Sequence, residues 1–263
     1  MEGPRFTDAI VRPPALSFAK GLTSGELGPP DLAVALRQHE SYCSALVAHG
    51  VRVHALQPAP AFPDSTFVED TAVLTSRIAI FTRPGALSRE EEVPLVADAL
   101  ARRFPAYDAI VAPGTLDGGD VCQIGDHFLI GLSARTNADG ADQLAEMLAE
   151  HGYSSSVVDV RGMSELLHLK SGVSWLGGDV VLASRHLMAH AALGQYQCIA
   201  VASDESYAAN CVSVNGCVLI PAGHPRTEAL VQRAGFATQA MDMTEFQKMD
   251  GGLSCLSLRF SDA

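Results

Sequence analysis

The chain has 263 residues, of which 48% are hydrophobic, 18% charged and 6% aromatic, with 23 glycines and 14 prolines. These proportions exclude a disordered chain, a collagen-like chain and a coiled coil, and they leave enough apolar residues for a sizeable core. Eighteen basic against thirty acidic residues give a net charge of −12, which disfavours nucleic acid as a partner.

Short strand pairs recur along the chain. An apolar strand, a tight polar turn and a second apolar strand are predicted four times, over residues 69–85, 119–131, 172–183 and 209–221. A fifth pair requires the C-terminal strand 255–260 to pair with the N-terminal strand 9–12. That pairing would close a ring and remove exposed strand edges, as in propellers. The alternative is an α+β sandwich whose hairpins are similar by chance.

Helices are predicted between these strand pairs. Apolar periodicity indicates helices over 31–47, 93–100, 137–150 and 227–234, three of them ending at a glycine. Ser88 and Glu91 have capping-box spacing before the second helix, although Pro94 would shift its start. The spacing of about forty to fifty residues is typical of repeat folds. Without a linker or a shift in composition, we expect one domain over 1–263.

Apolar runs, the first residues and the cysteines indicate the cellular compartment. No apolar run approaches the ~20 residues that span a bilayer, so we expect no membrane partner. Residues 1–8 lack a basic stretch followed by an apolar one, so we expect no secretory signal. The six cysteines contain no Cys-x-x-Cys pair, and we expect reduced thiols in a cytoplasmic protein without a metal site.

A few residues could carry chemistry. Cys255 follows Gly251-Gly252 at a strand start, where glycines allow a sharp turn and close approach of a ligand. A nucleophilic thiol needs a proton partner, for which His168 is a candidate, although both residues could equally be buried and inert. Acidic residues at strand starts, such as Asp70 and Asp117, would converge on the axis of a ring. Such a cluster suits a guanidinium, or else simply caps strand ends.

Nine segments resemble the dimethylarginine dimethylaminohydrolases, a family within the guanidino-group-modifying (pentein) superfamily. Leu-Asp-Gly-Gly-Asp at 116–120 marks the superfamily, whereas FPDSTFVED at 62–70 and DGGLSCLSLRF at 250–260 are more specific. The other six are GLTSGELGPPD, TRPGALSR, GLSARTNADG, LHLKSGV, ESYAANCVSVNG and PAGHPRT. The resemblance covers nearly the whole chain. It implies an α/β fold of five ββαβ modules around a pseudo-fivefold axis.

The resemblance also implies an activity without metal or organic cofactor. Nω-Methylated L-arginine would be hydrolysed to L-citrulline and methylamine or dimethylamine. Cys255 would be the nucleophile, and His168 would protonate the departing amine and then accept a proton from water. Asp117 would orient His168 and hold the guanidinium, at a position where relatives vary between Asp and Glu.

Further residues would bind the substrate if the resemblance holds. Asp70 would pair with the guanidinium nitrogens, supported by Glu69. Arg83 and Arg135 would clamp the α-carboxylate, a task that suits the guanidinium fork.

The α-amino end of the substrate would lie among a second group of residues. Asp64, with the backbone carbonyls near Leu22 and Met249, would receive the α-amino group. Phe67 would pack beside the substrate, and the Gly-Leu-Thr-Ser-Gly stretch around Leu22 would be a mobile lid.

Three alternatives stay open at this point. An arginine deiminase acting on unmethylated arginine would use the same residues. A non-catalytic ligand-binding relative would be expected to lack one of them, and a metal-binding protein would use Cys255 and His168. The expected partner is a small molecule, and the sequence is compatible with a homodimer.

Overall fold

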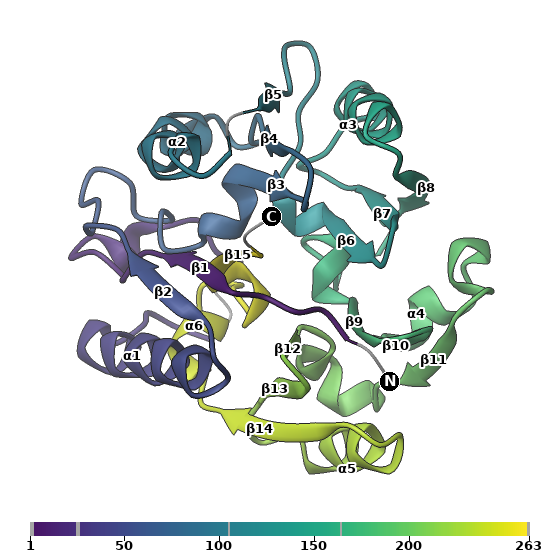
Figure 1. Ribbon diagram of the computed structural model, residues 1–263. Helices are drawn as coiled ribbons and strands as arrows, with labels where there is room; N and C mark the ends of the chain where they lie inside the picture. The colour runs from purple at the N-terminus through teal and green to yellow at the C-terminus, as the bar shows by residue number, and fades with distance from the viewer. Residues whose placement is uncertain (1–2, 25–26, 105, 164, 262–263) are drawn as a thin grey trace.

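The computed structural model describes residues 3–24, 27–104, 106–163 and 165–261. It contains five three-stranded sheets arranged as blades around a common centre (Figure 1). In each blade two antiparallel strands are followed by a helix and then by a third strand, parallel to the second. This is a ββαβ module repeated five times, so the predicted fivefold ring is confirmed.

Each blade has an inner strand near the centre, a middle strand, and an outer strand towards the rim (Figure 1). The outer strand is reached through the helix, because two parallel strands cannot be joined by a tight turn. In that order the blades are β15 (Ser257–Phe260), β1 (Asp8–Val11) and β2 (Arg52–Ala55); β3 (Ala72–Leu74), β4 (Ala79–Phe81) and β5 (Tyr107–Ala109); β6 (Val121–Ile124), β7 (His127–Leu132) and β8 (Ser154–Asp159); β9 (Val173–Gly177), β10 (Val180–Ala183) and β11 (Gln197–Ala200); β12 (Val212–Val214), β13 (Cys217–Pro221) and β14 (Ala237–Met241).

The first blade closes the ring with both ends of the chain. β1 pairs antiparallel with β15, with Asp8 opposite Phe260 and Val11 opposite Ser257. Thr7 N–H also donates to the Phe260 carbonyl at 3.0 Å. The predicted pairing of the N-terminal and C-terminal strands is therefore confirmed.

The helices are α1 (Leu32–Ala48), α2 (Pro94–Ala101), α3 (Ala138–Glu150), α4 (Arg185–Met188), α5 (Pro225–Arg233) and α6 (Thr244–Gln247). The longer ones, α1, α2, α3 and α5, lie on the outside of the ring, whereas α6 lies between α1 and the centre (Figure 1). The side chains of Asp31 and Asn137 accept from Val34 N–H and Gly140 N–H, which satisfies free donors at the starts of α1 and α3.

The predicted capping box before α2 is wrong. Ser88 and Glu91 lie in a separate 3-10 segment, Leu87–Glu92, and the α-helix begins only at Pro94. A proline fits the first helical position because its missing N–H would have no intrahelical partner there, and Val93, not a serine, stands at the N-cap.

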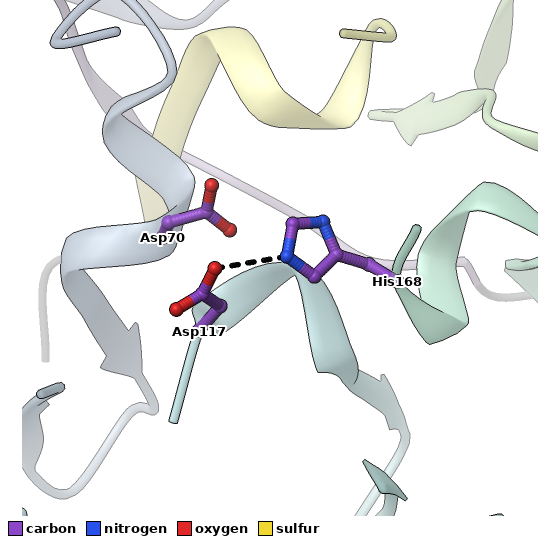
Figure 2. Close-up of side chains that lie close together, drawn as sticks. All are labelled: Asp70, Asp117 and His168. Atoms are coloured by element: carbon purple, nitrogen blue, oxygen red, sulfur yellow. Dashed lines mark hydrogen bonds and ion pairs between the residues drawn. The ribbon is translucent and has the colours of Figure 1, made fainter. Parts of the chain in front are cut away.

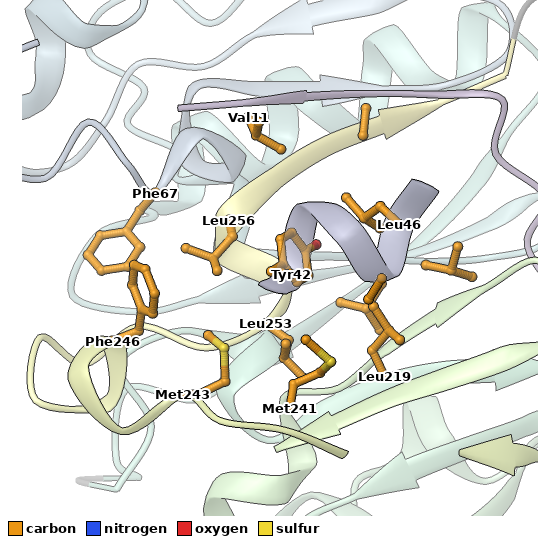
Figure 3. Packing of buried hydrophobic residues seen from close by; sticks show 14 of the residues in the cluster. Val11, Tyr42, Leu46, Phe67, Leu219, Met241, Met243, Phe246, Leu253 and Leu256 are labelled. Atoms are coloured by element: carbon orange, nitrogen blue, oxygen red, sulfur yellow. The ribbon is translucent and has the colours of Figure 1, made fainter. Parts of the chain in front are cut away.

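A large apolar core lies under the C-terminal segment that leads into β15. It joins α1, β1, β12, β13 and the chain around α6, and Figure 3 shows Tyr42 between Leu46 and Leu256. The Tyr42 hydroxyl also shares a hydrogen bond of 2.6 Å with the Ser257 hydroxyl. This packing fixes the position of the segment that carries Cys255.

Within the described residues, no helix is long and apolar enough to cross a membrane.

Candidate active site

Every inner strand is preceded by a short 3-10 turn. These five inner turns are Val68–Thr71, Gly118–Asp120, Leu169–Ser171, Ser203–Ala209 and Ser254–Leu256. Because the blades are arranged around one axis, the turns lie next to one another near the centre. Four of the five turns bring in predicted site residues. Glu69 and Asp70 lie in the first turn and Cys255 in the last, while Asp117 and His168 directly precede the second and the third. The ring thus brings together side chains that are far apart in the sequence.

His168 faces two carboxylates. Its Nε2 is 2.9 Å from Asp117 Oδ2, and Figure 2 shows Asp70 next to Asp117 on the same side of the ring. Asp117 is itself held by the Gly85 N–H, which donates to Oδ1 at 2.9 Å. Asp70 Oδ1 accepts from the Gly119 N–H at 2.8 Å. The imidazole therefore has a defined orientation.

The carboxylates determine the charge of this group. Burial disfavours a charged imidazole, but Asp70, Asp117 and Asp120 outweigh it and raise the pKa of His168 to about 9. For Asp70, burial is outweighed by the positive charges of His168 and Arg89, and its pKa falls to about 2. At neutral pH His168 is thus an imidazolium beside an ionised Asp70, so it carries the proton that a departing basic group would accept.

Glycine at position 119 is required by this close packing. A Cβ built there would lie 2.8 Å from both Asp70 Oδ1 and His168 Nδ1, closer than real Cβ contacts. A Cβ at Gly118 would collide with the backbone carbonyl of Glu69. The two glycines of the Leu-Asp-Gly-Gly-Asp motif therefore allow the inner turns to touch.

Cys255 lies in the last inner turn and is partly buried. Its Sγ is 3.4 Å from the Gly252 N–H and 4.0 Å from Asn210 Nδ2. Burial and the Glu69 and Asp70 carboxylates raise the pKa of its thiol to about 12. In this state the sulfur is a protonated thiol, and a positive charge nearby would favour the thiolate.

Asn210 directly follows the fourth inner turn, Ser203–Ala209, where no functional residue was predicted. Besides facing Cys255 Sγ, it accepts a hydrogen bond of 2.9 Å from the Ser254 N–H through Oδ1. A Cβ at Gly252 would collide with its amide. Asn210 therefore shapes the turn that carries the thiol.

Arg89 is a second residue that sequence reasoning missed. It is buried, pairs with Asp70 through Nη1, and pairs with Glu92 Oε2 through Nε and Nη2 at 3.0 and 2.8 Å. Its Nη2 also donates to the Phe67 carbonyl at 3.0 Å. In the sequence it stands in the charged run Ser-Arg-Glu-Glu-Glu, which is typical of an exposed surface, so no signal marked it.

A cavity of about 30 Å³ lies among these groups. Its lining residues are Leu22, Asp64, Phe67, Asp70, Arg89, Arg135, Leu167, His168, Met249, Asp250, Gly251 and Cys255. Eight of the eleven residues predicted for the site are in this set. Such a volume holds little more than a water molecule, so a larger ligand requires the walls to move.

The segment around Leu22 closes the cavity. The Leu22 N–H donates to both oxygens of Asp64, at 3.0 and 3.2 Å. The Thr23 hydroxyl donates to the Lys248 carbonyl at 2.7 Å, and the Ser24 hydroxyl donates to Asp250 at 2.8 Å. Gly25, the last residue of the predicted lid, lies outside the described residues.

Three predicted residues do not line the cavity. Asp117 lies behind His168, and Glu69 points to the other side of its turn, where it pairs with Lys170 at 2.7 Å. The Arg83 guanidinium pairs with Glu90 at 2.7 Å and donates to the Gly114 carbonyl at 3.2 Å. By contrast, Arg135 lines the cavity, and among the described residues its guanidinium has no hydrogen bond or ion pair assigned to it.

One group of residues has the spacing of a metal site. The ligand atoms of Asp70, Asp117 and His168 lie within 4.8 Å of one another. However, Asp70 is already paired with Arg89, and the imidazolium adds a second positive charge. The positions that a cation would neutralise are thus occupied by the protein's own cations, so this donor set fits a resident metal poorly.

Comparison with known proteins relates the chain to arginine-modifying enzymes. The arginine deiminase family model matches residues 62–222. An N(G),N(G)-dimethylarginine dimethylaminohydrolase from Pseudomonas aeruginosa is 45% identical over 97% of this chain and 100% of the relative. An enzyme of the same name from Streptomyces coelicolor is 37% identical, over 97% of each chain.

Solved structures agree with these relationships. The Pseudomonas aeruginosa enzyme, as a cysteine-to-serine mutant complexed with citrulline, has a TM-score of 0.94 at 45% identity and covers 97% of this chain and 100% of that chain. The N-terminal domain of ArgZ, an arginine dihydrolase from cyanobacteria, has a TM-score of 0.86 at 17% identity and covers 97% of this chain and 98% of that domain. The second likeness concerns the fold alone.

Proposed function

Because this chain belongs to the dimethylarginine dimethylaminohydrolase family of the pentein superfamily, we propose that it hydrolyses Nω,Nω-dimethyl-L-arginine, and the Nω-monomethyl form, to L-citrulline and dimethylamine or methylamine. The observation that carries the proposal is one cavity lined by the Cys255 thiol, the His168 imidazole and the Asp70 carboxylate. A thiol nucleophile, a proton donor and a counter-charge for a guanidinium are what this hydrolysis needs.

The first half of the reaction forms a bond to sulfur. A guanidinium is a poor electrophile because its charge is delocalised, and Asp70 localises that charge by pairing with its nitrogens. The Cys255 thiolate attacks the guanidinium carbon, and the tetrahedral adduct breaks its bond to the methylated nitrogen. His168, as the imidazolium, gives its proton to the departing amine, which leaves a covalent S-alkylthiouronium on Cys255.

The second half returns the enzyme to its starting state. His168, now neutral, removes a proton from water, and the resulting oxygen nucleophile attacks the same carbon. The adduct expels the Cys255 thiolate, its hydroxyl proton passes to the sulfur to restore the thiol, and L-citrulline is released. The Asp117 hydrogen bond keeps the imidazole in one orientation through both proton transfers.

Substrate binding would promote ionisation of the Cys255 thiol. Burial and two carboxylates raise the pKa of Cys255, so few molecules carry a thiolate before substrate arrives. A guanidinium in the cavity supplies a positive charge beside the sulfur and lowers the pKa of the thiol, whose proton passes to water because His168 is already protonated. The test is the titration of the thiol with and without an unreactive cationic ligand, and an identical titration in both conditions would refute substrate assistance.

The α-amino-acid end of the substrate would lie at the mouth of the cavity. Arg135 can receive the carboxylate with both arms of its fork, with Arg89 as the neighbouring positive charge. Arg83 would have to leave Glu90 to act as the second clamp predicted from the sequence. Asp64 would receive the α-amino group in place of the Leu22 N–H that it now binds, which couples substrate entry to movement of the lid.

A product assay tests the reaction. We expect Cys255→Ser to lose amine release by at least about a thousandfold, because a hydroxyl ionises far less readily than a thiol. Circular dichroism should show the wild-type fold. Cys198→Ser is the matched control, since Cys198 is also a partly exposed free cysteine and does not line the cavity. Near-normal turnover by Cys255→Ser would contradict the nucleophile assignment.

The same assay separates the nearest alternative. Dimethylamine release from asymmetric dimethylarginine is compared with ammonia release from arginine under identical conditions. A preference for unmethylated arginine would assign the chain to arginine deiminases instead.

We further propose that residues 1–263 act as one catalytic domain in the cytoplasm, with no nucleic-acid or membrane partner. A homodimer stays a prediction that sedimentation velocity can test.

A further inference from the structure

Glu69 is a buried carboxylate that connects three inner turns. Lys170 Nζ lies 2.7 Å from its Oε1, and the Ser254 hydroxyl donates to its Oε2 at 2.7 Å. Lys170 follows His168 by two residues, and Ser254 directly precedes Cys255. One carboxylate therefore joins the segment of the base to the segment of the nucleophile, without lining the catalytic cavity itself.

The charges of Glu69 and Lys170 act on the Cys255 thiol from the side away from the catalytic cavity. The negative charge of Glu69 raises the pKa of Cys255, while the positive charge of Lys170 lowers it. Arg259 Nη2 also pairs with Glu69 Oε1, at 3.2 Å. The side chains of Glu69 and Lys170 are only 5% and 15% exposed, so water screens their charges weakly.

We propose that Lys170 is a positioning residue, which pairs with Glu69 to hold the segments of Cys255 and His168 together and to offset the negative charge behind the thiol. Lys170 lies on the far side of Glu69, among the residues that line a separate cavity of about 310 Å³. It acts through Glu69 and not by contact with a substrate. The proposal deepens the proposed function, on which it rests.

The test measures the thiol directly. Alkylation of Cys255 by iodoacetamide is followed from pH 7 to 10 by mass spectrometry of its peptide, in wild type, Lys170→Met, Glu69→Gln and the double variant. Methionine keeps the length of the apolar stem and removes the charge. Loss of that charge should raise the thiol pKa by about one unit. Because a more basic thiolate is more nucleophilic, alkylation at a fixed pH should slow by about three- to fourfold.

Removing the charge of Glu69 should change the alkylation rate of Cys255 in the opposite direction. Glu69→Gln should speed alkylation, and the double variant should return close to wild type. A merely structural role would not give opposite shifts. Arg52→Met is the matched control, since Arg52 also pairs with a buried carboxylate, Asp8 at 2.7 Å, does not line the cavity and should leave the profile unchanged.

Steady-state kinetics give a second readout. Lys170→Met should lower kcat by about tenfold, with KM within about twofold, because it alters the thiol and not the substrate contacts. Lys170→Arg should retain most of the activity.

The outcomes are decisive even if one variant is unstable. If Lys170→Met does not fold, Glu69→Gln still tests the direction in which the alkylation rate shifts. Lys170→Arg then tests whether a positive charge at position 170 is sufficient. Equal alkylation profiles for all variants, or shifts in the same direction for Lys170→Met and Glu69→Gln, would overturn the proposal. Alkylation needs no substrate, so a different natural substrate would overturn the proposed function and leave this result intact.

Discussion

Three buried carboxylates act on His168, and for that reason the protonation of His168 contributes to the stability of the fold. Asp70, Asp117 and Asp120 raise its pKa from 6.5 to about 9 against the effect of burial. The folded chain therefore binds that proton more tightly than the unfolded chain does. The stabilisation is complete below pH 6.5 and is lost as the pH rises through about 9.

We expect the free energy of unfolding to fall by up to about 3 kcal/mol between pH 6.5 and 9. In His168→Asn this fall should be much smaller, because no proton binds there. Urea denaturation at several pH values within that window measures both slopes. Equal slopes in wild type and His168→Asn would show that another group is responsible.

Gly119 gives a steric prediction at the same place. In Gly119→Ala the added methyl group lies against Asp70 Oδ1 and His168 Nδ1, each at 2.8 Å before relaxation. We expect kcat to fall by about a hundredfold, since displacing a catalytic group by an ångström has an effect of that order. Gly162→Ala is the control, because a Cβ there meets nothing within 4 Å. Wild-type kcat in Gly119→Ala would contradict the close packing of the inner turns.

Some site residues were predictable from the sequence and others were not. Cys255 after two glycines and Asp117 before two glycines carry a local signal, because glycine allows the close approach that the site needs. Arg89, Asn210 and Lys170 carry none, since each acts through contacts with residues far away in the chain. The contacts of Asn210 and Lys170 join different blades, and those of Arg89 require the fold of its own blade.

The inner turns show why elements of almost no length can build a site. Each has three to seven residues, too few to be stable alone, and each is held by the strand that follows it. The strand pairs were predicted well because their alternation and turn residues are local properties. The 3-10 turns were not predicted, and Glu69 and Asp70 were expected in a strand. Backbone geometry around the axis, not local propensity, determines these turns.

The start of α3 links an outer helix to the active site. Asn137 caps the helix through Gly140 N–H at 2.8 Å, accepts from Thr115 N–H at 2.9 Å and donates to the Pro113 carbonyl at 3.0 Å. Thr115 is two residues from Asp117. One amide thus holds both the helix and the segment leading to the catalytic carboxylate.

We expect Asn137→Ala to lower the free energy of unfolding by about 2 kcal/mol. Asp31→Ala is the comparison, because the Asp31 side chain caps α1 through a single bond to Val34 N–H. That loss should be about 1 kcal/mol. Urea denaturation of both variants measures the difference. If Asp31→Ala were the more damaging, the added contacts of Asn137 would contribute nothing.

The whole molecule depends on the seam between its first and last strands. Phe260 on β15 is buried and packs against Phe104, with ring centroids 5.4 Å apart, and Arg103 lies over the same ring. Its backbone pairs with β1. The seam thus joins the two ends of the chain to the adjacent blade.

Phe260→Ala should lower the free energy of unfolding by about 3 to 5 kcal/mol, through the cavity left at the seam. Thermal and chemical unfolding should remain a single transition if the ring unfolds as a unit. Leu16→Ala is the control, because Leu16 is 87% exposed and should change stability little. A loss below about 1 kcal/mol for Phe260→Ala would show that the seam contributes little.

The closed ring also makes the position of the chain ends arbitrary. The Ser261 hydroxyl donates to the Arg5 carbonyl, so the segments near the two ends run side by side. A peptide linker could join the ends, and a new start could be cut in the connection between any two other blades. Such a circular permutant would carry its nucleophile early or midway in translation instead of near the end, with the same groups meeting at the axis.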